Sequence, residues 1–170
     1  MKNAFLLAAV AGAALAGCFS IPMTPGEFRD AIKSTGKGKF ESFEVKRPLA
    51  DVARSFKKKA PECLNYKLTS TQTPTIGVSS SPRVYAVARE KVIQSGGRVE
   101  LHFQVESVGN LAKEPPGGNY IVVADAVGLR ADRTRVDIYR GGGALVAQAI
   151  RAWAGGDERG CPDPMRTHEW

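Results

Sequence analysis

Apolar and polar residues alternate most clearly along residues 98–106. Val99, Leu101, Phe103 and Val105 are apolar, and the residues between and beside them are polar. A period of two predicts a strand with one buried face and one face in water. The chain predicts further strands at residues 40–47, 66–72, 83–94, 120–129 and 134–140.

A period of three to four residues predicts two longer helices. Within residues 48–60 one helical face collects the apolar side chains of Leu49, Val52, Ala53, Phe56 and Ala60. We expect Pro61 to end this helix. Residues 144–154 carry a second apolar stripe, formed by Leu145, Val146, Ala149, Ile150 and Trp153. A brief helix is predicted at residues 27–33, because Thr24-Pro25-Gly26-Glu27 matches a capping box with proline at the first helical position.

The order of these elements is a strand, a helix, a run of five strands and a final helix. Short turns between successive strands favour an antiparallel meander, because parallel strands would need a helix in each connection. The predicted fold is therefore α+β, with an antiparallel sheet of about five to six strands and two helices packed on one face. This order is helix-grip-like over residues 40–154. It resembles the domains of BamC-type lipoproteins of the outer-membrane assembly machinery and the cavity-bearing START-like proteins.

The first residues have the pattern of a secretory signal peptide. Lys2 gives a positive start, and residues 4–17 are apolar or glycine, a run too short to span a bilayer and without a basic cluster after it. Leu15-Ala16-Gly17-Cys18 resembles the lipobox of bacterial lipoproteins. The resemblance implies that Cys18 is lipidated with diacylglycerol and becomes the new amino terminus. Because Phe19 rather than aspartate follows, it also implies the outer membrane of a Gram-negative host, with the domain facing the periplasm.

The chain of 170 residues then divides into four parts. Residues 1–17 are the signal peptide, and residues 18–39 form a lipid-anchored tether with a short helix. Residues 40–156 form the α+β domain, and residues 157–170 form a polar tail. The stretch from Phe43 to Tyr66 is similar to uncharacterised proteobacterial lipoproteins, a likeness that implies no activity.

Net charge adds one candidate contact surface. The whole chain has a formal charge of +7, and removal of Lys2 with the signal peptide leaves +6. Arg54, Lys57, Lys58 and Lys59 form a basic cluster toward the end of the predicted helix at 48–60. Cations at a helix C-terminus are favoured by the helix dipole, which explains the cluster structurally. The sharper alternative is a contact patch for lipid headgroups. Nucleic acid is not an expected partner, since no aromatic residues interleave with these lysines.

The remaining cysteines, Cys63 and Cys161, predict a disulfide, because an even pair in an exported chain is oxidised. Such a bridge would tie the tail to the domain. We expect neither a metal nor a cofactor: the two cysteines are far apart in sequence, and His102 and His168 have no ligand spacing around them.

No catalytic constellation is present in the sequence, and we expect no enzyme. His102 lies on the polar phase of its strand, which predicts an exposed histidine. Asp125 is in phase with Ile121, Val123 and Val127 in an apolar run, and a buried carboxylate needs a partner. Arg135 or Arg89 on a neighbouring strand would serve, in a structural ion pair.

Two functional hypotheses follow. The first is a non-enzymatic, outer-membrane-anchored lipoprotein that acts as an interaction or accessory module and binds an envelope protein. The second is a periplasmic binding module for a small apolar ligand or lipid, held in a helix-grip cavity between sheet and helices. A cavity would favour the second, whereas a filled core would favour the first.

Overall fold

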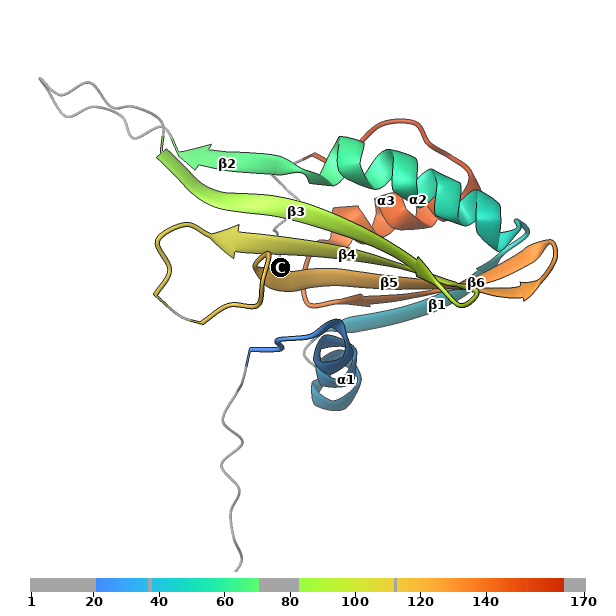
Figure 1. Cartoon of the computed structure of the whole chain (residues 1–170), viewed down its shortest axis with the longest axis horizontal. Helices are drawn as coiled ribbons and strands as arrows, with labels where there is room; N and C mark the ends of the chain where they lie inside the picture. The colour runs from blue at the N-terminus through green and yellow to red at the C-terminus, as the bar shows by residue number, and fades with distance from the viewer. Residues whose placement is uncertain (1–20, 37, 71–82, 112, 164–170) are drawn as a thin grey trace, which may run out of the picture.

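A computed structural model describes residues 21–36, 38–70, 83–111 and 113–163 of the chain. Six strands form one antiparallel sheet, ordered β1-β6-β5-β4-β3-β2. The strands are β1 (Lys39–Val45), β2 (Tyr66–Ser70), β3 (Arg83–Ser95), β4 (Arg98–Ser107), β5 (Asn119–Arg130) and β6 (Arg133–Arg140). The helices are α1 (Pro25–Thr35), α2 (Leu49–Leu64) and α3 (Ala144–Gly155). Helices α2 and α3 lie on one face of the sheet and α1 lies on the other (Figure 1).

This arrangement confirms the predicted α+β class, the antiparallel sheet and the two helices on one face. Strands β2 to β6 pair in chain order as a meander, and β1 pairs with β6 at the far edge. Helix α2 carries the chain across the sheet from the β1 edge to the β2 edge (Figure 1). We call the side covered by α2 and α3 the helix face, and the side that carries α1 the α1 face.

The main core lies on the helix face. Its largest side chains are fully buried, and they come from both helices and from the central strands: Phe56, Leu64, Leu101, Phe103, Ile138, Ile150 and Trp153. Helix α2 does not end at Pro61 as predicted, but continues to Leu64. Proline removes one backbone donor from a helix interior, and here burial of Cys63 and Leu64 in the core offsets that loss.

The predicted disulfide is confirmed. Cys63 in α2 is bonded to Cys161, with 5.1 Å between the two Cα atoms and a sequence separation of 98 residues. Further contacts hold the chain after α3 against α2: the Ser55 hydroxyl donates to the Glu158 carboxylate at 2.8 Å, and Lys58 pairs with the same group at 2.8 Å. Residues 157–161 are therefore fixed to α2 by covalent and polar contacts together.

Arg47 joins these elements at the end of α3. Its guanidinium donates to the carbonyl oxygens of Trp153 at 2.9 Å and Ala154 at 3.0 Å in the last turn of the helix. The Trp153 carbonyl also accepts from the Gly156 amide at 3.1 Å. Thr134 in β6 donates to the Arg47 carbonyl at 2.8 Å. The segment between β1 and α2 is thus connected to both α3 and the sheet.

Helix α1 forms a third layer rather than part of a free tether. Phe28 and Ile32 pack on Val123 and Tyr139 of the sheet, and all four side chains are buried. The Thr24 hydroxyl accepts a hydrogen bond from the Glu27 amide at 3.2 Å, as the capping box predicts. Gly36 ends the helix in the left-handed conformation, with φ of 64°. Of the helices in the described part of the chain, none is long and apolar enough to cross a membrane.

Candidate functional site: a charged cluster and a groove beside helix α1

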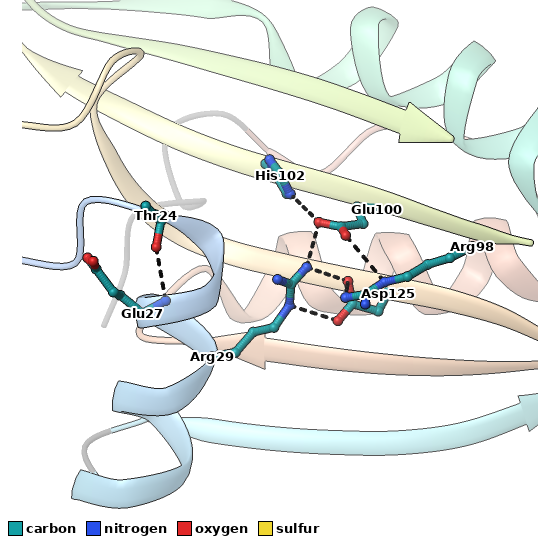
Figure 2. A network of polar contacts seen from close by, with 7 residues as sticks. All are labelled: Thr24, Glu27, Arg29, Arg98, Glu100, His102 and Asp125. Carbon is teal, nitrogen blue, oxygen red and sulfur yellow. Dashed lines mark hydrogen bonds and ion pairs between the residues drawn. The ribbon is translucent and has the colours of Figure 1, made fainter. Parts of the chain in front are cut away.

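The α1 face brings together charged residues from three elements. In the register of β4 and β5, Glu100 lies opposite Asp125. Two carboxylates placed opposite one another repel. Arg29 of α1 enters between them: its Nη2 lies 2.6 Å from Glu100 Oε2 and 2.6 Å from Asp125 Oδ1, and its Nε lies 2.8 Å from Asp125 Oδ2 (Figure 2). The guanidinium therefore bridges both strands and fixes α1 to the sheet.

Arg98 completes the charge balance. Its Nη2 lies 2.8 Å from Asp125 Oδ1, and its Nε lies 3.3 Å from Glu100 Oε1. The Arg29 cluster, as we name it, consists of Arg29, Arg98, Glu100, His102 and Asp125, and Figure 2 shows it from close by. The Asp125 side chain is 6% exposed and that of Arg29 is 16% exposed. Two guanidinium groups thus compensate two carboxylates that are largely removed from water.

The environment keeps Arg29 and Glu100 ionised. Burial raises the pKa of Glu100, but hydrogen bonds from Arg29 and His102 outweigh it, and the net pKa is lowered. Burial lowers the pKa of Arg29, but its bonds to Asp125 and Glu100 prevail and raise it. A carboxylate held in its charged form by guanidinium groups is a poor proton donor or acceptor near neutral pH. The cluster is therefore suited to structural positioning rather than to acid–base chemistry.

The predicted burial of Asp125 is confirmed, whereas its predicted partners are wrong. Arg135 pairs with Asp137 at 3.3 Å, and Arg89 pairs with Glu106 at 3.1 Å. The partners that Asp125 takes are Arg98 on the neighbouring strand β4 and Arg29, 96 residues away in the chain. Strand alternation carries no information about which side chain a helix on that face will contribute, so the sequence offered no signal for Arg29.

His102 is not the exposed residue that its polar phase predicts, since it is only 3% exposed. Its Nε2 lies 3.0 Å from Glu100 Oε2. Because Glu100 is ionised and can only accept, Nε2 carries the hydrogen. Burial lowers the pKa of His102 and outweighs the opposing effect of Glu100, so the imidazole is neutral at pH 7. Its Nδ1 then has a free lone pair, and Figure 2 shows this second nitrogen turned away from Glu100.

A groove of about 390 Å³ opens beside the Arg29 cluster. Residues 23–25, at the start of α1, form one wall. The rest is formed by Lys91, Ile93, His102, Gln104, Pro116 and Tyr120. Gln104 is 7% exposed, and its Nε2 donates to the carbonyl oxygens of Pro116 at 3.1 Å and Gly118 at 2.7 Å. The Tyr120 ring meets the His102 ring edge-on, with 5.9 Å between centroids. The groove thus combines apolar walls with a few fixed polar groups.

The residues of the predicted basic patch do not share one exposed surface. The Lys59 side chain is only 6% exposed and pairs with Glu62 at 2.9 Å. Its position three residues after Phe56 and four before Cys63 puts it on the buried stripe of α2. The other three are exposed but already engaged: Arg54 with Asp51 at 2.9 Å, Lys58 with Glu158, and Lys57 with the Gln94 side chain at 2.7 Å. Lys59 is therefore not available for contact with a lipid headgroup.

Three further predicted residues, all cysteines, complete the account. Cys18, the predicted lipidation site, lies outside the described residues. Cys63 and Cys161 lie with Glu62 within 4.8 Å of one another, counted between potential ligand atoms. The two sulfurs are bonded to each other, so they are not thiolate ligands for a metal.

Comparison with known proteins adds no relative. No protein-family model matches the chain, and neither the curated proteins nor the solved structures give a match. The helix-grip and lipobox resemblances therefore stay predictions, and function has to be argued from the geometry of the molecule.

Proposed function

We propose that the protein is a lipid-anchored envelope protein, held at the outer membrane through Cys18, that acts as a non-catalytic interaction module in the periplasm. The disulfide between Cys63 and Cys161 supports an exported location, because disulfides persist mainly in oxidising compartments. The lipobox-like sequence before Cys18 supports the anchor.

The observation that carries the interaction role is the unequal cover of the two sheet faces. Helices α2 and α3 cover the helix face, whereas on the other side α1 buries mainly Val123 and Tyr139. Side chains on either side of α1 stay accessible: Phe40 is 46% exposed, Arg89 is 55% exposed and Arg135 is 46% exposed. The exposed part of the α1 face, which we call the open face, includes Phe40, Arg89 and Arg135. A surface of mixed apolar and charged residues is suited to a protein partner.

The anchor would hold this open face near the bilayer. Six residues, 19–24, separate Cys18 from the first residue of α1. Fully extended, they reach at most about 20 Å. Because α1 itself lies on the open face, we expect the partner to be a protein in or close to the membrane.

The packing of the helix face favours this proposal over an apolar ligand between sheet and helices. Phe56, Phe103 and Trp153 fill that layer and are 0–1% exposed. A ligand cavity needs several hundred cubic ångströms of space. Side chains that are packed and buried in this way indicate a filled core between sheet and helices. A binding site is therefore expected on an outer surface.

The anchor is tested by fractionation of cells that express the wild-type chain or the Cys18→Ser variant. We expect the wild type to sediment with outer membranes and its N-terminal peptide to carry the mass of the lipid. The variant is expected to be in the soluble periplasmic fraction. An unmodified Cys18, or identical fractionation of the two proteins, would show the anchor to be wrong.

The interaction is tested by mild crosslinking in the native membrane, followed by purification and mass spectrometry. Wild type is compared with Arg89→Glu/Arg135→Glu on the open face and with Lys57→Glu on α2 as a matched charge reversal. We expect one stoichiometric protein partner that is lost only in the open-face variant. A bound lipid without any protein partner would instead support the apolar-ligand hypothesis.

A further inference from the structure

The groove on the α1 face is lined by two hydrogen-bond acceptors from largely buried residues. One is His102 Nδ1, since Nε2 already donates to Glu100. The other is Gln104 Oε1, since Nε2 of that amide donates to two carbonyl groups of the loop between β4 and β5. Among the described residues, neither acceptor has a hydrogen-bond partner. Neither atom is among the fully buried side-chain atoms of the described residues that lack a partner, so water or a ligand reaches both from the groove. A ligand that donates to both reproduces the hydrogen bonds of the water that it displaces.

The two acceptors come from the same face of β4 and have a third polar group beside them. His102 and Gln104 are two residues apart on β4, so their side chains leave the same face about 7 Å apart. Lys91 lies opposite His102 on β3, is exposed, and has no ion partner within the described ranges. Its ammonium group provides a donor at the rim. The groove is therefore complementary to a ligand with several hydrogen-bond donors and at least one acceptor.

The charge and the hydrogen-bonding groups of the groove exclude some classes of ligand. An ionised carboxylate or phosphate oxygen only accepts hydrogen bonds, so it would face both acceptors without a donor between them. A cationic donor would be repelled by the ammonium group of Lys91 at the rim. Hydroxyl groups on a neutral ring donate to both acceptors and accept from Lys91 at once.

The walls suit such a ring. Ile93, Pro116 and the Tyr120 ring provide apolar surface beside the polar groups. The volume of about 390 Å³ is near the lower end for ligand sites, which suits one or two small rings. We propose that this groove binds a sugar ring, either a free monosaccharide or the end of a glycan. The inference goes beyond the proposed function and does not depend on the anchor at Cys18.

The test is calorimetric titration and saturation-transfer NMR with the protein as purified from its host, in a detergent without a sugar headgroup. The probes are glucose, N-acetylglucosamine and the β-1,4-linked tetramer of N-acetylglucosamine. We expect saturable binding of at least one probe. Tighter binding of the tetramer than of the monosaccharides indicates a glycan end, and equal binding indicates a free sugar.

Variants locate the site. His102→Leu removes the acceptor and should weaken binding about threefold to tenfold, the effect of one hydrogen bond. His102→Gln keeps a donor for Glu100 and an acceptor for the groove, and should retain the affinity. Lys91→Met alters only an exposed side chain and should weaken binding without affecting the fold. Lys67→Met, on the neighbouring strand β2 and outside the groove, is the matched control.

The proposal is overturned if none of the three probes binds. It is also overturned if binding is unchanged in both His102→Leu and Lys91→Met, because the sugar would then sit elsewhere. Neither result affects the crosslinking experiment with the open-face variant, so the two proposals fail separately.

Discussion

The two faces of the sheet are covered by different physical means, although the same strands form both. Along β4, Val99, Leu101 and Phe103 enter the apolar core under α2 and α3. The alternate residues Glu100 and His102 belong to the Arg29 cluster on the other side. Apolar packing needs only compatible shapes, whereas a buried carboxylate needs a specific cation. The helix face should therefore dominate global stability, and the α1 face should depend on a few individual contacts.

The largest expected effect is on the helix face. Trp153→Ala removes a side chain that is 1% exposed in the main core. We expect the free energy of unfolding to fall by about 4 kcal/mol. Urea unfolding followed by circular dichroism measures it, with Leu129→Ala at a 42% exposed position as control. A loss below about 1 kcal/mol, no larger than that of an ordinary mutation, would contradict the importance of this core.

The disulfide is expected to have the next largest effect. Cys161→Ser opens a loop with a sequence separation of 98 residues and should reduce stability by about 3 kcal/mol. Wild type unfolded in a reducing agent should approach the variant, and the variant should not respond to the agent. Free thiols at both positions in the exported wild type, detected by mass spectrometry without reduction, would refute the bridge.

Most of the helix face could be predicted from sequence. The strands begin and end within two residues of the predicted positions. Alternate side chains of a strand point to opposite faces, so burial of one face produces a period of two in the sequence. The apolar stripes of α2 and α3 were equally informative. Pro61 misled the prediction of the α2 end, because the local preference of proline yielded to the burial of Leu64.

The α1 face could be predicted only in part. Alternation places Glu100 and His102 on the strand side opposite the main core, but it does not show that a second layer covers that side. Only two buried residues, Phe28 and Ile32, mark the contact side of α1. Two apolar residues do not predict that α1 packs on the sheet. The sequence therefore places α1 in a tether and His102 on an uncovered surface. The groove has contributions from four separate segments, and no local pattern joins them.

The ion pairs of the Arg29 cluster test whether the α1 face depends on individual contacts. Asp125→Ala leaves Arg29 and Arg98 without their shared acceptor, and should lower stability by about 2 kcal/mol. The loss should be concentrated in α1, because Arg29 links that helix to the sheet. Hydrogen exchange should therefore increase along α1 more than along α2.

Two comparisons separate this local effect from a general one. In a double-mutant cycle, adding Arg29→Ala to Asp125→Ala should cause less further loss than Arg29→Ala alone. Arg89→Ala breaks an ion pair whose side chains are 55% and 46% exposed, and should change stability by at most about 1 kcal/mol. Additive losses in the cycle, or equal exchange in α1 and α2, would mean that the cluster does not hold α1.

The smallest effect expected is a pH dependence from His102. The groups that face it are Glu100, Asp125 and Arg29 of the cluster, together with Tyr120 and Lys91. Its pKa in the folded protein is lowered by burial, so the unfolded chain binds a proton more readily below its ordinary pKa of about 6.5. The contribution of His102 is present in full above that value, and is lost as the pH falls toward its folded pKa.

Glu100, whose pKa is also lowered, adds to the same loss only below about pH 4.5. Glu90, whose pKa burial raises, has the opposite effect above about pH 4.5, and it does so equally in wild type and in His102→Gln. Between about pH 7 and pH 5.5 the difference between wild type and His102→Gln therefore isolates the histidine. We expect urea unfolding to show wild-type stability falling across this interval and the variant changing less. If the free energy of unfolding changes with pH in the same way in both proteins, the His102 ring is not buried from water. The α1 face would then be more accessible to water than its contacts indicate.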